Sequence, residues 1–118
     1  MSKYEPHEVD RYIAEQPEQN RAELKRITAI LADVFETEPM ISYQIIGFKS
    51  GKHYLLYLSG WKDHLSFHGQ NTGLGKEFCE RYPQWFKLKG TTMHFQPKPQ
   101  LPEEIIRELA ARRLELLH

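Results

Sequence analysis

The hydrophobic positions of the first 40 residues follow the period of a helix. Val9, Tyr12 and Ile13 predict a short helix over residues 6–15, because they fall on one side of a helix and Pro17 disfavours helix at the residue before it. A second helix is predicted over residues 17–36, since proline is tolerated in a first helical turn. Its hydrophobic residues recur at three-to-four spacing: Leu24, Ile27, Leu31, Val34 and Phe35.

Beyond Met40 the hydrophobic period changes to two, which predicts strands. Ile41, Tyr43 and Ile45 alternate with polar residues in the first predicted strand, and Ser50–Gly51 then supplies a turn. The later predicted elements are strands over residues 53–61, 64–68 and 91–96, a helix near 75–82 between the last two strands, and a final helix that Pro102 opens.

The order of these elements, ααβββαβα, predicts an α+β fold in which helices pack on one face of an antiparallel four-stranded sheet. A chain of 118 residues is the size of one domain, so we expect a single domain over residues 1–118. Alternation sorts the strand residues by face. One set is expected to face the helices: Ile41, Tyr43, Ile45, Tyr54, Leu56, Leu58, Leu65, Phe67, Met93 and Phe95. The other is expected to face away: Ser42, Gln44, His53, Ser59, His64, Ser66, His68, Thr92, His94 and Gln96.

Four of the six histidines therefore share the outer face of the predicted sheet: His53, His64, His68 and His94. Histidine is the commonest metal ligand, so these side chains can be read as a candidate metal or anion site. Residues four apart on a strand are separated by roughly 13 Å, so a metal site would need ligands from neighbouring strands. The alternative is a polar face in contact with water.

Acidic residues of the two amino-terminal helices form a second candidate metal site: Glu5, Glu8, Asp10, Glu15 and Glu18. Carboxylate oxygens suit ferrous iron and other hard cations, and three-to-four spacing brings side chains together on a helix. The alternative is a solvated helix face on which these acids pair with neighbouring arginines and lysines.

Composition excludes several classes of function. The 16 basic and 16 acidic residues give no net field to attract a polyanion, so a nucleic-acid partner is not expected. The longest apolar run, residues 54–58, is far shorter than the roughly 20 residues that span a bilayer, and the amino end has acids where a secretory signal is apolar. Cys79 is the only cysteine, so no intrachain disulfide can form. These features predict a cytoplasmic protein without a membrane partner.

The charges are unevenly placed, with a net −4 over residues 1–40 and +4 over residues 41–118. Five lysines bracket the ends of the predicted strands: Lys49, Lys52, Lys62, Lys87 and Lys89. They can form a pocket for a small anion, with Trp61, Tyr57 or Trp85 as its apolar wall, or they can serve only solubility and the protection of strand edges. No nucleophile motif or phosphate loop is present, so no catalytic residue is predicted.

Several motifs together resemble the YdhG-like family, a bacterial domain of unknown function. They are Tyr12-Ile13, Ile41-Ser42-Tyr43, Gly47-Phe48-Lys49, Lys62-Asp63-His64-Leu65-Ser66-Phe67, and Lys89-Gly90-Thr91-Thr92-Met93-His94-Phe95 followed by Pro99, Leu101 and Pro102. The resemblance implies a frataxin-like fold. It also implies iron handling, since the family includes a frataxin-like chaperone thought to deliver ferrous iron to haem and iron–sulfur assembly.

Two hypotheses follow. In the first, the protein binds ferrous iron weakly through its amino-terminal acids and delivers it to iron–sulfur or haem assembly proteins, which dock on the histidine-bearing sheet face. In the second, it is a non-enzymatic module that binds a small anion or a protein. The candidate pocket residues that the resemblance carries over for this role are Tyr43, Phe48, Lys49, Lys62, His64 and Lys89.

Overall fold

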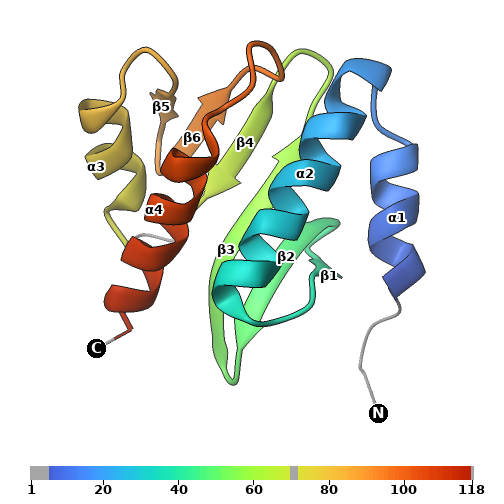
Figure 1. The fold of residues 1–118 in the computed structure, drawn as a ribbon, viewed down its shortest axis with the longest axis horizontal. Helices are drawn as coiled ribbons and strands as arrows, with labels where there is room; N and C mark the ends of the chain where they lie inside the picture. The colour runs from blue at the N-terminus through green and yellow to red at the C-terminus, as the bar shows by residue number, and fades with distance from the viewer. Residues whose placement is uncertain (1–5, 70–71, 118) are drawn as a thin grey trace.

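Four helices lie over one face of a six-stranded antiparallel sheet in the computed structural model, which describes residues 6–69 and 72–117 (Figure 1). The helices are α1 (Pro6–Ala14), α2 (Glu18–Phe35), α3 (Leu74–Arg81) and α4 (Glu103–Glu115). The strands are β1 (Met40–Ser42), β2 (Ile45–Ser50), β3 (His53–Gly60), β4 (Leu65–His68), β5 (Lys87–Lys89) and β6 (Thr92–Phe95). They pair in the order β1-β2-β3-β4-β6-β5. The α+β class is confirmed, whereas the prediction of four strands is wrong.

The first predicted strand is a hairpin of two strands. Tyr43 and Gln44 form its two-residue turn with φ of 53° and 65°, and Ser42 pairs with Ile45. Such turns usually carry Asn-Gly, so this pair provides no turn signal. Tyr43 is 81% exposed and Ile45 lies on the opposite face from the buried Ile46, so the prediction that these two residues face the helices is wrong.

A β-bulge in β3 corrects the predicted side of Tyr54. Phe48 pairs with Leu56 and Lys49 with Tyr54, which leaves Leu55 as an extra residue. The bulge turns Tyr54 to the outer face, where its ring stacks on that of Tyr57 with centroids 5.4 Å apart. Leu55 is fully buried in the core instead.

Arg113 of α4 stabilises this bulge from the helix side. Its side chain is buried; Nε donates to the carbonyl oxygen of Leu55 at 2.6 Å and an Nη donates to that of Tyr54 at 3.1 Å. Burial lowers the pKa of the guanidinium. The bulge carbonyls thus have a buried donor, which such groups require.

A single hydrophobic core fills the space between the helices and the sheet. The inward side chains of β2, β3, β4 and β6 meet the apolar faces of α2, α3 and α4 there: Ile46, Phe48, Leu56, Leu58, Leu65, Phe67, Met93, Phe95, Leu24, Ile27, Leu31, Leu74, Phe78, Ile106 and Leu109. In the described part of the chain, no helix has the length and apolar character needed to cross a membrane.

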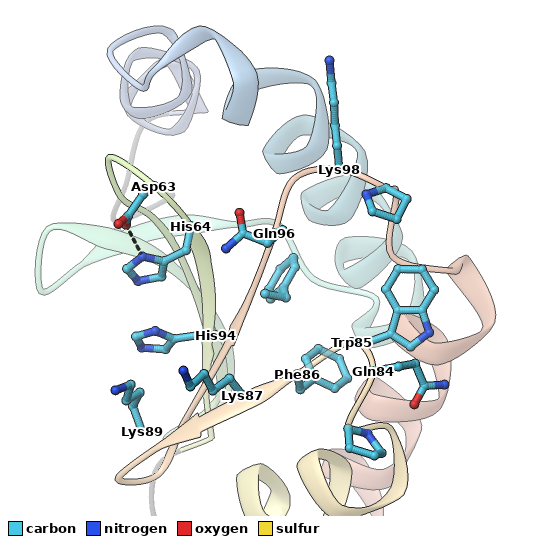
Figure 2. A pocket seen from close by; sticks show the side chains of 13 residues that line it. Asp63, His64, Gln84, Trp85, Phe86, Lys87, Lys89, His94, Gln96 and Lys98 are labelled. Carbon is cyan, nitrogen blue, oxygen red and sulfur yellow. Dashed lines mark hydrogen bonds and ion pairs between the residues drawn. The ribbon is translucent and has the colours of Figure 1, made fainter.

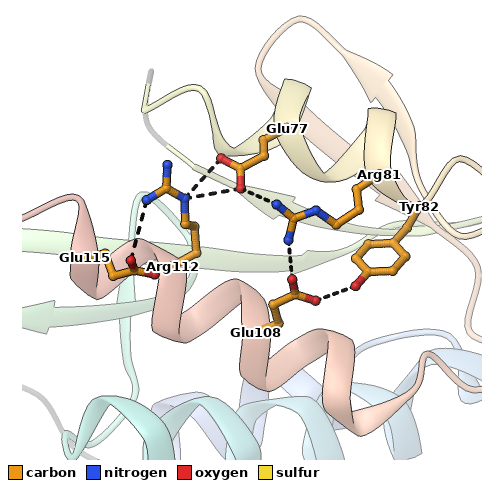
Figure 3. Close-up of polar contacts among 6 residues, drawn as sticks. All are labelled: Glu77, Arg81, Tyr82, Glu108, Arg112 and Glu115. Atoms are coloured by element: carbon orange, nitrogen blue, oxygen red, sulfur yellow. Dashed lines mark hydrogen bonds and ion pairs between the residues drawn. The ribbon is translucent and has the colours of Figure 1, made fainter.

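Two polar networks fix the segments that flank β5 and β6. Between α3 and α4, Glu77 accepts hydrogen bonds from Arg81 and Arg112, and Glu108 accepts from Arg81 and Tyr82 (Figure 3). The bond to Glu108 raises the pKa of the Tyr82 phenol. Tyr82 is thereby held at the start of the segment that leads into β5.

The second network holds the proline-rich segment that follows β6. The buried carboxylate of Glu23 accepts hydrogen bonds from Arg26 at 2.8 Å and from Gln100 at 3.2 Å. Arg26 also donates to the carbonyl oxygen of Leu101. Gln100 and Leu101 are therefore tied to α2.

The edge strand β5 was not predicted, because its sequence Lys-Leu-Lys places no buried residue in the sheet. It pairs with β6 through Lys87 with His94, Leu88 with Met93, and Lys89 with Thr92. Helix α3 packs closely behind it. A Cβ on Gly75 would lie 2.7 Å from the carbonyl oxygen of Thr91, so glycine permits this approach.

Candidate functional site

The face of the sheet that the helices leave uncovered carries two rows of side chains across four strands. In one row Ser59 pairs with Ser66, Ser66 with His94, and His94 with Lys87. The neighbouring row contains Tyr57, His68, Thr92 and Lys89 in the same strand order. The outer face therefore combines imidazoles, hydroxyls and lysines near the β5 edge.

Three rings stack at one end of this face. The His64 and His94 centroids are 4.2 Å apart with planes 14° from parallel, and the Trp61 centroid lies 6.3 Å from that of His64 with planes 21° from parallel. His64 precedes β4 instead of belonging to it. Its Nδ1 donates to the carboxylate of Asp63 at 2.7 Å, and its carbonyl oxygen accepts from the Trp61 amide at 2.8 Å. The hydrogen bond from His64 lowers the pKa of Asp63.

The junction of α1 and α2 holds the turn that carries Trp61 and His64. The Gly60 amide donates to the Tyr12 hydroxyl at 3.0 Å, and Asn20 donates to the carbonyl oxygen of Trp61 at 2.7 Å. Gln19 donates to the next carbonyl oxygen, that of Lys62, at 3.0 Å. Three helix side chains thus fix three successive backbone groups, so the ring stack rests on a rigid turn.

His68 lies beside the stack in a network of hydroxyls. Its Nε2 hydrogen-bonds to Oγ of Ser59 at 2.8 Å and its Nδ1 to Oγ1 of Thr92 at 3.2 Å. The Trp61 indole N–H also donates to Oγ of Ser59, at 2.9 Å. Burial, with a smaller effect of His94, lowers the pKa of His68, so its ring is neutral at pH 7. Both ring nitrogens are engaged, which leaves no lone pair for a metal in this arrangement.

A cavity of about 660 Å³ opens next to the ring stack, where β5 and β6 part. Its two sides are the segments 83–87 and 94–99. Figure 2 shows His64, His94 and Lys89 at one end and Trp85 at the other. Pro83, Phe86, Phe95 and Pro99 complete the apolar end. The volume falls in the range typical of small-molecule sites.

The charge around this cavity is positive. Three lysines line it, Lys87, Lys89 and Lys98, against the single carboxylate of Asp63. None of the three forms an ion pair with a carboxylate of residues 6–69 or 72–117. Burial lowers the pKa of His94, and the charges of His64 and Lys89 lower it further. The site therefore holds uncompensated positive charge beside an apolar wall, an arrangement that favours an organic anion.

Some of the predicted pocket residues meet at this cavity and others do not. His64 and Lys89 line it, together with His94. Phe48 is fully buried in the core, and Lys49 lies over the ring of Tyr54 with Nζ 5.2 Å from the centroid.

Two further predicted pocket residues lie outside the lining. Tyr43 packs against Tyr57 at the β1–β2 turn. Lys62 is exposed beside Asp63 and takes no part in lining the cavity.

The predicted metal ligands are dispersed. Glu8 and Asp10 are exposed on α1, Glu15 in the turn after it and Glu18 at the start of α2; Glu5 lies outside the described residues. His53 is exposed at the β2–β3 turn, opposite Ser50 and away from His64, His68 and His94. The bulge places it on the helix side of the sheet, so the prediction that it shares the outer face is wrong. The described residues contain no group of three or more His, Cys, Asp or Glu side chains that could hold a metal ion.

Sequence reasoning missed Asp63, Lys98, Pro83 and Pro99 as part of the site. Their only signal is their place at the ends of strands, which does not show that the segments before β5 and after β6 face each other. Trp85 was a candidate for the apolar wall, and it does line the cavity.

Comparison of the chain with models of protein families, with curated proteins and with solved structures finds no match. The functional inference therefore rests on the geometry of the described residues.

Proposed function

We propose that this protein binds a small organic anion in the cavity between residues 83–87 and 94–99. The observation that carries the proposal is the lining itself: three lysines and two stacked imidazoles against a single carboxylate, with Trp85 at the opposite end from the imidazoles (Figure 2). Lysines without acidic partners are poised for an external anion, and an aromatic wall favours a ligand with an apolar part.

The position of the site at an edge of the sheet supports binding over simple surface solubility. Lys87 and Lys89 are exposed, as lysines that only protect an edge strand also are, so the neighbouring groups distinguish the two roles. Here Lys87 lies directly across from His94 in the register, and His94 stacks on His64. Lys87 and Lys89 therefore lie beside the two imidazoles at one end of the cavity, whereas Lys98 lies at the other end (Figure 2).

Ferrous-iron delivery remains the alternative that the resemblance to YdhG-like proteins implies. The exposed acids of the amino-terminal helices support weak cation contacts at most. Among the described residues, no three His, Cys, Asp or Glu side chains lie close enough together to hold a metal ion. Anion binding has the stronger support, since it uses groups that lie together. Docking of iron–sulfur or haem assembly proteins is part of the iron alternative, and no contact among the described residues supports it independently.

A thermal-shift screen of organic anions, followed by calorimetry, tests the proposal. A ligand present at a hundred times its dissociation constant adds about 2.7 kcal/mol of stability. We expect stabilisation by members of the panel that is weaker in Lys89→Gln and unchanged in Lys52→Gln. Lys52 is a matched control because it is an exposed lysine at the β2–β3 turn, outside the cavity.

Two results would contradict the proposal: no anion in a broad panel shifts the unfolding temperature, or Lys52→Gln weakens binding as much as Lys89→Gln. A parallel anaerobic titration with ferrous iron addresses the alternative. Heats that disappear when Glu8, Asp10, Glu15 and Glu18 are replaced by their amides would favour iron handling.

A further inference from the structure

We infer that the anion is a phosphate monoester with a flat apolar substituent: the phosphate lies among Lys87, Lys89 and His94, and the substituent lies against Trp85. This inference rests on the proposed function and names the ligand class of the same cavity.

The charge of the lining points to a dianion. Three lysines against one aspartate give the whole lining a formal charge of +2 from these four side chains, with Lys98 at the end that carries Trp85 (Figure 2). A phosphate monoester carries between about −1.5 and −2 at pH 7, whereas a carboxylate carries only −1. A monocarboxylate would therefore leave one lysine charge of the lining without a counter-charge.

The arrangement of donors suits a tetrahedral group more than a planar one. Lys87 and Lys89 project from alternate positions of β5 onto the outer face, opposite His94 and Thr92 of β6. His64 approaches from the other side, stacked on His94. The donors thus come from two strands and a turn, and each can reach a different oxygen of a phosphate. A carboxylate has two oxygens in one plane and cannot satisfy all of them.

The opposite end of the cavity is suited to an apolar group. Trp85 and the rings of Pro83 and Pro99 line it, above the buried Phe86 and Phe95. Figure 2 shows the indole of Trp85 on the far side of the cavity from the two imidazoles. A volume of about 660 Å³ accommodates both a phosphate and a ring attached to it.

Calorimetry at pH 7 with three probes tests this assignment: phenyl phosphate, benzoate and inorganic phosphate. Phenyl phosphate combines the dianion and the ring, benzoate keeps the ring with one charge, and inorganic phosphate keeps the charge without a ring. We expect phenyl phosphate to bind at least about tenfold more tightly than either of the others.

Two variants test which part of the ligand binds at each end of the cavity. Lys89→Gln is expected to weaken phenyl phosphate binding about tenfold while benzoate changes less. Trp85→Leu is expected to remove the preference of phenyl phosphate over inorganic phosphate without changing the affinity for inorganic phosphate. Because Trp85 packs partly against the core, the unfolding temperature of the Trp85→Leu variant is measured as well. The comparison of the three probes on the unaltered protein does not depend on this variant.

The outcomes separate the two proposals. If benzoate or another carboxylate binds as tightly as phenyl phosphate, the phosphate assignment is overturned while anion binding stands. Equal phenyl phosphate affinity in Lys89→Gln and the unaltered protein also overturns it. If neither these probes nor the wider panel binds, both proposals fail.

Discussion

The imidazole rings of His64 and His94 stack face to face with their centroids 4.2 Å apart, at the entrance of a cavity lined by lysines. Two stacked imidazoles cannot both become imidazolium cations without strong mutual repulsion unless an anion lies nearby. His64 already donates a hydrogen bond to Asp63, whereas the pKa of His94 is lowered by burial and by the surrounding positive charges. Protonation of His94 and anion binding should therefore favour each other.

The first prediction concerns the pH dependence of anion affinity. Below the lowered pKa of His94, its ring gains a positive charge and the cavity attracts anions more strongly. Sulfate is a suitable probe because its charge does not change between about pH 5 and pH 7.5. We expect it to bind about fivefold more tightly at the lower pH, since unit charges about 4 Å apart in water interact by about 1 kcal/mol. Calorimetry at both values checks this, and a His94→Gln variant should show a smaller pH dependence.

The second prediction has the opposite sign and concerns the free protein. The pKa values of His68 and His94 are lower in the folded state than in the unfolded chain, so below about pH 6.5 the unfolded chain binds more protons. The stability that these residues contribute is fully present above that pH and is lost as pH falls through their folded pKa values. Urea unfolding should thus show a lower free energy at pH 5 than at pH 7.5. His68→Gln should flatten this profile; an unchanged slope would show that His68 is not responsible.

The third prediction concerns the strained β1–β2 turn. Gln44 has φ of 65°, a left-handed conformation that costs a non-glycine residue about 1 kcal/mol. Gln44→Gly should therefore raise the free energy of unfolding by about 1 kcal/mol and leave anion binding unchanged. Gly51→Ala is the reverse control, because Gly51 has φ of 59° and open space around it. It should destabilise the protein through the backbone alone; stabilisation by Gly51→Ala would refute the assignment of strain.

The fourth prediction concerns Arg113, whose side chain is the buried donor to the bulge in β3. Arg113→Met leaves the carbonyl oxygens of Leu55 and Tyr54 without that donor and should lower the free energy of unfolding by about 3 kcal/mol. Arg107 is an exposed arginine of the same helix that pairs with Glu103 and Asp33. Its replacement by methionine should change stability by less than about 1 kcal/mol. Equal effects of the two variants in urea unfolding would contradict the role given to the bulge.

Much of the fold could be predicted from the hydrophobic period. The four helices lie within about two residues of their expected bounds, because each has an apolar stripe and a proline near one end. Three details could not be predicted. The turn at Tyr43–Gln44 lacks turn residues, and the bulge at Leu55 depends on Arg113 from the far end of the chain. The edge strand β5 places no buried residue in the sheet.

The candidate site was predictable only in part. Alternation correctly brought His68 and His94 to the outer face, and of the five lysines at the predicted strand ends only Lys87 and Lys89 line the cavity. The cavity itself depends on the pairing of β5 with β6, which sets the segments containing Trp85 and Pro99 opposite each other. That pairing involves a strand that the hydrophobic pattern does not reveal. Phe48 was placed in the candidate pocket by the resemblance alone, whereas its pairing with Leu56 directs it into the core.

The central claim is that anions bind where β5 and β6 part. A titration of the ¹⁵N-labelled protein with phenyl phosphate, followed by two-dimensional NMR, locates the binding site most directly. The account predicts shifts of the Trp85 indole N–H and of the amides of Lys87, Lys89 and His94, with His53 and Lys52 unaffected. Shifts confined to α1 or to the β1–β2 turn, or none at saturating ligand, would contradict it.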